Sequence, residues 1–319
     1  MIVRTVLGDV SPESLASVYM HEHLILDSRL IAQQFPHLLL DSVDHAVEEV
    51  AACRASGVGA MVDTMPCAGG RDPIRLAEVS RRSGVAIIAT TGLHTAKYYP
   101  DHPWAMTGAS DELAALFIAD LEEGIDRFDH RGTAIELTTH RAGIIKVATS
   151  TEELDARDVR LFEGAAMAAT ATGAPILTHC EEGRGGMEQI ACLTELGVAP
   201  NRVVLSHTDK VADVGYHRDL LATGVNLEYD QSLRQTPAEE KGTAWLLSEM
   251  IEAGHVDQLM LGTDGARRSL WTSLGGAPGL AWLVTGFTDV MRSHGLDEAQ
   301  LRTMFETNPQ RFLSFEATA

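Results

Sequence analysis

Polar side chains, most of them common metal ligands, close five short apolar runs spread along most of this chain. Each run has the length and composition of a buried β-strand. The side chains are His21 and His23 after residues 16–20, Lys146 after residues 143–145, His179 after residues 175–178, His207 after residues 203–206 and Asp264 after residues 259–263. Residues so far apart in sequence can meet only in a fold that brings many strand ends to one place. A (β/α)8 barrel does so at the C-terminal ends of its eight parallel strands.

The rest of the chain alternates in the same way between strand-like and helix-like stretches, as βαβ units do. We expect eight strands, at residues 17–20, 60–64, 85–90, 144–148, 175–178, 203–206, 226–229 and 259–262. Helical periodicity predicts helices at residues 42–55, 72–82, 111–128, 155–171, 186–196 and 237–253. No linker or low-complexity segment divides the sequence. The prediction is an α/β protein, a (β/α)8 TIM barrel forming a single domain over residues 1–319.

Composition restricts the partners and the compartment. The formal net charge of −20 would repel nucleic acid and anionic membrane surfaces. No segment approaches the roughly 18 consecutive apolar residues of a membrane span, and the first residues lack the apolar stretch of a secretory signal. The four cysteines show no CxxC spacing and are expected to be reduced thiols. We therefore expect a cytoplasmic protein with a small-molecule substrate, and neither nucleic acid nor membrane as a partner.

The His-x-His sequence is the most compact part of the pattern. On an extended chain, His21 and His23 point to one side and Glu22 points to the other. A shared metal ion explains this arrangement, although two neighbouring histidines can also serve packing alone. His179 and His207, each at a strand end, favour the metal, because ions such as zinc combine imidazole with carboxylate ligands.

Asp264 and Lys146 could complete such a site. Asp264 could bind a metal ion and accept a proton from water whose pKa the metal has lowered to about 7, whereas its Thr-Asp-Gly context alone would suggest a turn. Lys146 is unexpected, since divalent cations repel an ammonium group. It could be a surface lysine or a buried amine with a lowered pKa. A third possibility is a carbamate formed with carbon dioxide, which is an anionic ligand able to bridge two metal ions.

The complete ligand pattern resembles that of the phosphotriesterase-like family in the amidohydrolase superfamily. That family has His-x-His after the first strand, a carboxylated lysine after the fourth, histidines after the fifth and sixth, and aspartate after the eighth. The chain matches all of these positions, and the correspondence runs from about residue 8 to residue 312. The resemblance implies a binuclear centre of two divalent ions: His21, His23 and Asp264 at the more buried ion, His179 and His207 at the more exposed ion, and carboxylated Lys146 as the bridge.

The same resemblance implies a metal-dependent hydrolase. A hydroxide activated by the two metal ions would attack a carbonyl or phosphoryl centre, and Asp264 would be the catalytic residue that takes up the proton. Zinc is the expected metal, with manganese, cobalt and iron as alternatives. Some relatives relay protons through an acidic residue after the sixth strand. That spacing is not clearly reproduced here, and either Asp209 or Asp213 could serve.

Two long segments, residues 91–110 and 265–278, are expected to wall the substrate pocket. The second resembles the branch of the family that hydrolyses sugar lactones, some of them phosphorylated. Its adjacent arginines would suit a phosphate or carboxylate, although each could instead form a surface ion pair. The expected substrate contacts are Arg268, preferred as the anion ligand, with Arg267, Arg234, Trp271 and Tyr98; Tyr99 is an alternative to Tyr98.

The leading functional hypothesis is a lactonase that acts on a sugar lactone or on an anionic lactone, including a phosphorylated one. One alternative is hydrolysis of phosphotriesters or N-acyl amides, since loops on a common barrel set the choice. An alternative of another class is a metal-containing barrel that binds a ligand without turnover, which the intact Asp264 disfavours. Relatives are often homodimers, so a homodimer is a further expectation.

Overall fold

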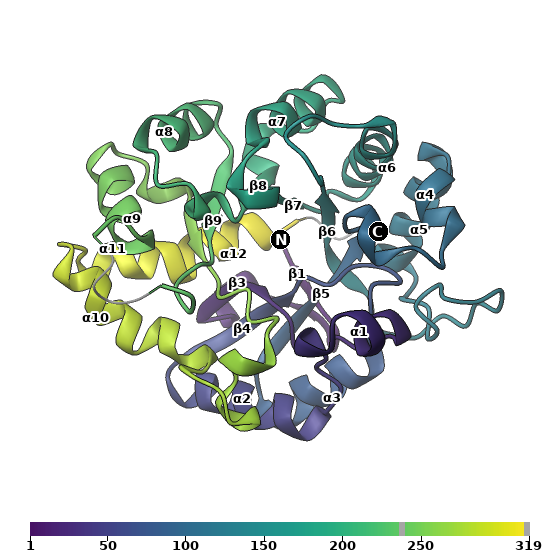
Figure 1. Ribbon diagram of the computed structural model, residues 1–319, viewed down its shortest axis with the longest axis horizontal. Coiled ribbons are helices and arrows are strands. Elements are labelled where there is room, and N and C mark those ends of the chain that lie inside the picture. The colour runs from purple at the N-terminus through teal and green to yellow at the C-terminus, as the bar shows by residue number, and fades with distance from the viewer. Residues whose placement is uncertain (236–239, 316–319) are drawn as a thin grey trace.

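The structure, a computed structural model, describes residues 1–235 and 240–315. Within these ranges, eight parallel strands form one nearly closed barrel with helices around it (Figure 1). Strands that follow one another in sequence pair in the sheet. The strands are β3 (Ser17–Glu22), β4 (Val58–Asp63), β5 (Ala86–Gly92), β6 (Ala142–Ala148), β7 (Ile176–His179), β8 (Val203–Ser206), β9 (Asn226–Tyr229) and β10 (Leu259–Leu261). The predicted (β/α)8 barrel is confirmed, and each predicted strand matches one of these within two residues.

The helices that surround the barrel follow the predicted alternation. They are α1 (Arg29–Gln34), α2 (Val43–Ala55), α3 (Pro73–Ser83), α4 (Pro103–Thr107), α5 (Ser110–Glu122), α6 (Ala156–Thr172), α7 (Gly186–Glu195), α8 (Val214–Ala222), α9 (Thr243–Glu252), α10 (Gly286–Ser293), α11 (Glu298–Arg302) and α12 (Asn308–Leu313). A short antiparallel pair, β1 (Val3–Thr5) and β2 (Gly8–Val10), precedes them. Part of the helix expected at residues 237–253 lies outside the described residues, as does the end of the domain expected over residues 1–319.

The helix predicted at residues 111–128 is wrong in its last third. α5 ends at Glu122, and the chain then pairs with residues further along the sequence. The backbone N–H of Ile125 donates to the carbonyl of His140, and that of Thr138 donates to the carbonyl of Ile125. These bonds replace the helical ones, so the backbone groups of this segment remain satisfied without a longer helix.

The barrel closes between β10 and β3 just beyond the last residue of β10. The backbone N–H groups of Thr263 and Asp264 donate to the carbonyl of His21, at 3.1 and 2.9 Å. The buried carboxylate of Glu22 also accepts from the N–H of Thr263 at 3.0 Å. Glu22 therefore points away from the pocket, as its place between two histidines predicted. Its hydrogen bond with Thr263 connects the first strand of the barrel to the end of the last.

Alternate side chains of the strands fill the barrel interior below the site. This inner cluster contains Val62, Ile88, Ile144, Leu177 and Val204, among others. Lys146 and His179 follow Ile144 and Leu177 by two residues, so strand alternation places them on the same inward face, one layer higher. No helix in the described part of the chain is long and apolar enough to cross a membrane.

Candidate metal centre

A β-bulge near the end of β3 turns the two histidines of the His-x-His sequence toward the barrel mouth. Tyr19 pairs with Met61 and Glu22 pairs with Asp63, so three steps along β3 match two steps along β4. The extra residue of a bulge re-aims the side chains that follow it. Both His21 and His23 consequently line the pocket.

The pocket has a volume of about 450 Å³ and lies at the C-terminal ends of the strands. It brings together side chains that come from four strand ends of the barrel. The predicted ligands that line it are His21, His23, His179, His207 and Asp264. Lys146, the sixth, is 1% exposed and is not among the described lining residues.

His21, His23 and Asp264 form one compact group whose candidate ligand atoms all lie within 4.8 Å of one another. The Oδ1 atom of Asp264 lies 3.4 Å from Nε2 of His23 and 3.8 Å from Nε2 of His21. Burial alone would raise the pKa of Asp264, but Arg234 and His23 outweigh it and hold the pKa well below its usual value. The group therefore offers two imidazoles and an ionised carboxylate, a donor set that suits a divalent ion.

Buried polar atoms without partners support the fit of this site to metal. Among the described residues, the Nζ atom of Lys146 and the Nδ1 atom of His23 have no hydrogen-bond partner. Such atoms are rare in folded proteins and call for an explanation. Burial lowers the pKa of Lys146 to about 8, although Glu228, Asp264 and Asp230 act in the opposite direction. A substantial fraction of this amine is therefore neutral near that pH.

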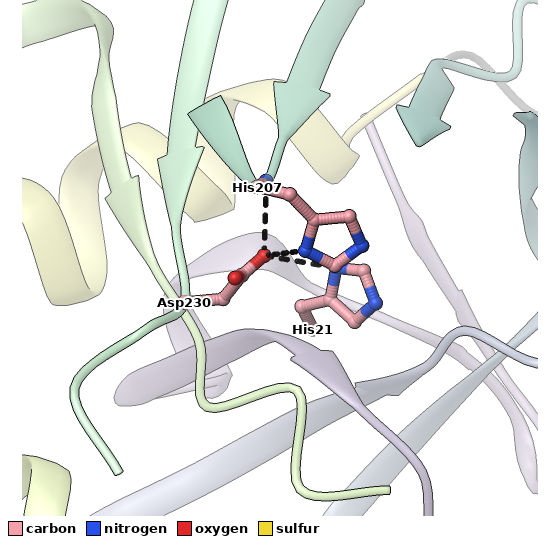
Figure 2. A group of neighbouring side chains, drawn as sticks. All are labelled: His21, His207 and Asp230. Carbon is pink, nitrogen blue, oxygen red and sulfur yellow. Dashed lines mark hydrogen bonds and ion pairs between the residues drawn. The ribbon is translucent and has the colours of Figure 1, made fainter. Parts of the chain in front are cut away.

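His207 and His21 turn their Nδ1 atoms toward Asp230, which follows β9. Figure 2 shows the three side chains pointing toward one another. The Oδ2 atom of Asp230 lies 2.7 Å from Nδ1 of His207 and 3.6 Å from Nδ1 of His21. It also accepts from the backbone N–H of His207 at 3.1 Å. His207 has a φ of 67°, and this left-handed turn at the end of β8 places its ring next to that of His21, with 4.8 Å between the ring centroids.

His179 contacts a second carboxylate at the pocket edge. Its Nε2 atom lies 2.7 Å from Oε2 of Glu181, and its ring centroid lies 4.5 Å from that of His207. Burial and the neighbouring His207 lower the pKa of His179 to about 3. The hydrogen bond from His179 lowers the pKa of Glu181 to about 2. His179 is thus a neutral imidazole, the form that binds metal.

His94, which the sequence did not single out as a ligand or contact, also lines the pocket. Its ring centroid lies 4.8 Å from that of His179 and 4.5 Å from that of Tyr98. The Nδ1 atom accepts from the backbone N–H of Thr95 at 2.7 Å. Burial and His179 lower its pKa well below the usual value. The neutral ring must therefore carry its proton on Nε2.

The predicted substrate contacts divide into two groups. Arg234, Arg267 and Tyr98 line the pocket, and Arg234 donates to Oδ2 of Asp264 at 2.8 Å. Arg268 donates to the carbonyl of Leu39 at 2.7 Å, and Trp271 is buried with its Nε1 donating to the carbonyl of Gly265. Neither of these two is among the described lining residues. Their roles in substrate binding stay predictions.

The other residues that the sequence left open have structural partners. Tyr99 is buried, and its hydroxyl accepts from the backbone N–H of His94 at 2.7 Å. Asp209 accepts from the backbone N–H groups of Asp230 and Gln231. Asp213 caps α8 by accepting from the N–H of Tyr216. Both acids thus hold backbone groups in place, and their part in a proton relay stays a prediction.

Comparison with known proteins agrees with the geometry. Residues 1–313 match the model of the Phosphotriesterase family. The chain is 27% identical over 323 residues to a phospho-furanose lactonase of Mycoplasmopsis synoviae, covering 98% of this chain and 92% of the relative. It is 28% identical over 319 residues to an aryldialkylphosphatase of Saccharolobus solfataricus, covering 96% and 97%. The crystal structure of an amidohydrolase from Mycoplasma synoviae superposes with a TM-score of 0.91 at 27% identity, covering 99% of this chain and 92% of that one.

Proposed function

We propose, from the premise that this chain belongs to the phosphotriesterase family, that it is a metal-dependent hydrolase that opens the ring of a sugar lactone, specifically an anionic or phosphorylated one. The observation that carries the proposal is the convergence of His21, His23, His179, His207 and Asp264 on one pocket of about 450 Å³. The strand ends of a (β/α)8 barrel are where such enzymes place their active sites.

The residues fit a centre of two divalent ions. His21, His23 and Asp264 would hold one ion, His179 and His207 would hold the other, and a carbamate on Lys146 would lie between them. When bound, the two ions would lower the pKa of water to about 7 and polarise the substrate oxygen. The unpartnered, partly neutral amine of Lys146 supports the carbamate, because only the neutral form reacts with carbon dioxide. Zinc remains our expectation for the metal.

Side chains around the centre would orient the substrate and move the proton. Asp264 stays ionised and can accept the proton of the attacking water, while Arg234 holds its Oδ2 atom at 2.8 Å. The Nε2–H group of His94 would donate a hydrogen bond to a substrate oxygen. Tyr98 lines the pocket beside it and would cover the sugar ring. These roles require the substrate to bind in the pocket between His94, which follows β5, and Asp264, which follows β10.

Positive charge at the pocket mouth supports an anionic substrate. Arg267 and Lys210 are exposed lining residues, and neither makes an ion pair with another residue that the structure describes. Guanidinium and ammonium groups without a carboxylate partner suit phosphate, for which arginine offers a planar fork. The phospho-furanose lactonase of Mycoplasmopsis synoviae, by its name, acts on such a substrate.

A substrate screen tests the proposal. Protein reconstituted with zinc, manganese or cobalt would be assayed on aldonolactones, their phosphates, acyl-homoserine lactones, N-acyl amides and an activated phosphotriester. We expect kcat/KM for a phosphorylated aldonolactone to exceed the others by at least about a hundredfold, or about 2.7 kcal/mol at the transition state. A preference for the phosphotriester, which the aryldialkylphosphatase relative keeps open, would contradict it. Metal binding without any turnover would favour a ligand-binding barrel.

A homodimer and a cytoplasmic location complete the proposal. Size-exclusion chromatography with light scattering would decide the first, and fractionation of cells the second. We propose no nucleic-acid or membrane partner, in keeping with the net charge of −20.

A further inference from the structure

A buried glutamate lies inside the barrel next to the first histidine ligand. Glu228 belongs to β9, where it pairs with Ser206 of β8 and Met260 of β10. Its residue exposure is 0%. Its Oε2 atom lies 3.3 Å from Nδ1 of His21. The contact joins a carboxyl group of the seventh barrel strand to a predicted ligand of the first.

The backbone is built to allow this contact. Gly262 lies just beyond β10, between Glu228 and His21. A Cβ atom on Gly262 would lie 2.5 Å from Oε1 of Glu228 and 2.7 Å from the backbone nitrogen of His21. Both distances are too short for real atoms, so any larger residue would push the carboxyl group away from the ring. Glycine at this position leaves the space that the contact needs.

The two nitrogens of His21 face different groups. Nε2 faces Asp264 at 3.8 Å, whereas Nδ1 faces Glu228 at 3.3 Å and Asp230 at 3.6 Å. A second set of candidate metal ligands lies on the Nδ1 side of the ring and consists of His21, His207 and Asp230. However, a neutral imidazole has one lone pair and one N–H. The lone pair is on one nitrogen only, and carboxyl oxygens near the other nitrogen would accept a hydrogen bond from its N–H group.

We propose that Glu228 is a positioning residue that keeps the proton of His21 on Nδ1 and so directs its Nε2 lone pair at the metal centre. The inference rests on the proposed function, because it assumes that the centre binds metal. Asp230, two residues further along the chain, makes the corresponding contact with Nδ1 of His207 at 2.7 Å. Hydrogen-bond acceptors of this kind fix the tautomer and ring orientation of metal-binding histidines, and their loss typically costs 10- to 100-fold, roughly, in metal affinity.

A pair of substitutions separates the hydrogen bond from general packing. Glu228→Gln keeps an acceptor oxygen, and Glu228→Leu keeps approximate volume without an acceptor. The zinc dissociation constant of each purified protein would be measured by competition with a chromophoric chelator. We expect Glu228→Leu to weaken binding about 10- to 100-fold and Glu228→Gln to change it by less than about threefold. Thermal unfolding of the metal-free proteins shows whether each variant is folded.

A matched control is available in a second buried glutamate. Glu49 is 1% exposed and accepts from Thr272, Ser273 and Leu280, with no contact to a histidine among the described residues. Glu49→Gln should leave the zinc affinity unchanged. If it weakens zinc binding as much as Glu228→Leu does, the effect is not specific to the His21 contact and the proposal is overturned.

The remaining outcomes are decisive in the same way. Unchanged zinc affinity in Glu228→Leu overturns the proposal, and so does an equal loss in the Gln and Leu variants, which would point to charge rather than hydrogen bonding. If Glu228→Leu does not fold, nitrogen NMR of histidine-labelled, zinc-loaded protein is the deciding measurement. We expect His21 of the wild type to be protonated on Nδ1, with a nitrogen resonance that shifts in Glu228→Gln. Protonation of His21 on Nε2 would overturn the proposal. Wild-type protein that binds no zinc would instead remove the proposed function itself.

Discussion

At the scale of single residues, Lys146 is the position that most clearly separates a binuclear centre from an ordinary cluster of histidines. A buried lysine without a partner is costly unless its charge is removed, and nothing described around its Nζ atom accepts a hydrogen bond from it. Formation of a carbamate would remove the positive charge and convert the amine into a ligand. Formation of the carbamate would thus explain why the folded protein buries this amine.

Replacing Lys146 with methionine tests this reading. The methionine side chain fills similar space but cannot form a carbamate. We expect Lys146→Met to stay folded, to hold less than the full complement of metal and to lose measurable turnover. Metal content by emission spectrometry and thermal unfolding of the metal-free protein are the measurements. An active and fully metallated Lys146→Met protein would rule out the bridging role.

The two arginines after β10 provide a matched pair of variants. Arg267 lines the pocket, whereas Arg268 donates to the carbonyl of Leu39. Charge-assisted hydrogen bonds are worth about 1.5 to 3 kcal/mol, so Arg267→Met should lower kcat/KM for a phosphorylated lactone by at least about tenfold and leave a neutral lactone almost unaffected. Arg268→Met should affect both substrates equally. The reverse result would favour the preference for Arg268 that the sequence suggested.

At the scale of elements, the contact between the ends of β5 and β6 leaves no room for a side chain. Gly92 has a φ of +99°, and a Cβ atom there would lie 1.9 Å from the carbonyl oxygen of Lys146. A backbone oxygen cannot move away as a flexible side chain can. The same residue therefore limits both the strand pairing and the position of Lys146.

Substitution of Gly92 should be much more harmful than substitution of a glycine with a similar backbone but free space. Gly92→Ala should lower the free energy of unfolding by at least about 2 kcal/mol, from backbone strain and overlap together. Gly84 has a φ of +70° and nothing within 4 Å of its Cβ position, so Gly84→Ala should cost only about 1 kcal/mol. Urea unfolding midpoints give both values, and equal losses would show that overlap with Lys146 contributes nothing.

The elements were predictable where buried apolar runs define them, as in β8 and β9, whose predicted ranges are those observed. The prediction failed where hydrogen bonds to distant parts of the chain determine where an element ends. The end of α5 depends on hydrogen bonds between Ile125 and Thr138 or His140, which no local periodicity reveals. The six predicted ligand positions could be chosen because strand ends converge in a barrel, and five of them line one pocket.

The orientation of individual side chains could not be predicted from the sequence in the same way. Asp230 was missed, although it directly follows a predicted strand, because one carboxylate at a strand end has many uses. The bulge in β3 that aims His21 and His23 appears only in the pairing with β4. Which of two adjacent arginines faces the pocket depends on the path of the whole loop. These features are tertiary, so the sequence around each residue does not contain them.

At the scale of the whole molecule, a buried ion cluster joins three separate segments. Arg71, which follows β4 in the chain, donates to Asp120 of α5 and to Asp129 in the segment after it, both at 2.7 Å. His130 lies 3.2 Å from the second oxygen of Asp120. Arg71, Asp120 and Asp129 are all 1% exposed or less. Loss of Arg71 would leave two buried carboxylates without their shared cation, and loss of Asp120 would leave Arg71 with Asp129 as its remaining carboxylate partner. Either loss should cost more than loss of a surface pair.

The pH dependence of this cluster follows from Asp120. Burial alone would raise the pKa of Asp120, but Arg71 and His130 outweigh it and hold the pKa at about 2. The pKa of aspartate in an unfolded chain is about 3.9. Because the folded value is the lower one, Asp120 contributes stability that is fully present above about pH 4 and is lost as the pH falls toward 2.

Asp120→Asn should therefore destabilise the protein most near neutral pH. Arg71 keeps its ion pair with Asp129 but loses its charged hydrogen bond to Asp120, so we expect a loss of about 1.5 to 3 kcal/mol in the free energy of unfolding at pH 7. The difference from wild type should shrink as the pH falls from about 4 toward 2, because the wild-type carboxylate is then protonated. Urea unfolding at a series of pH values measures both effects. Glu78→Gln, which removes an exposed ion pair with Arg81, is the control and should change stability by less than about 1 kcal/mol at any pH. A pH-independent difference for Asp120→Asn would mean that shape rather than charge holds these segments together.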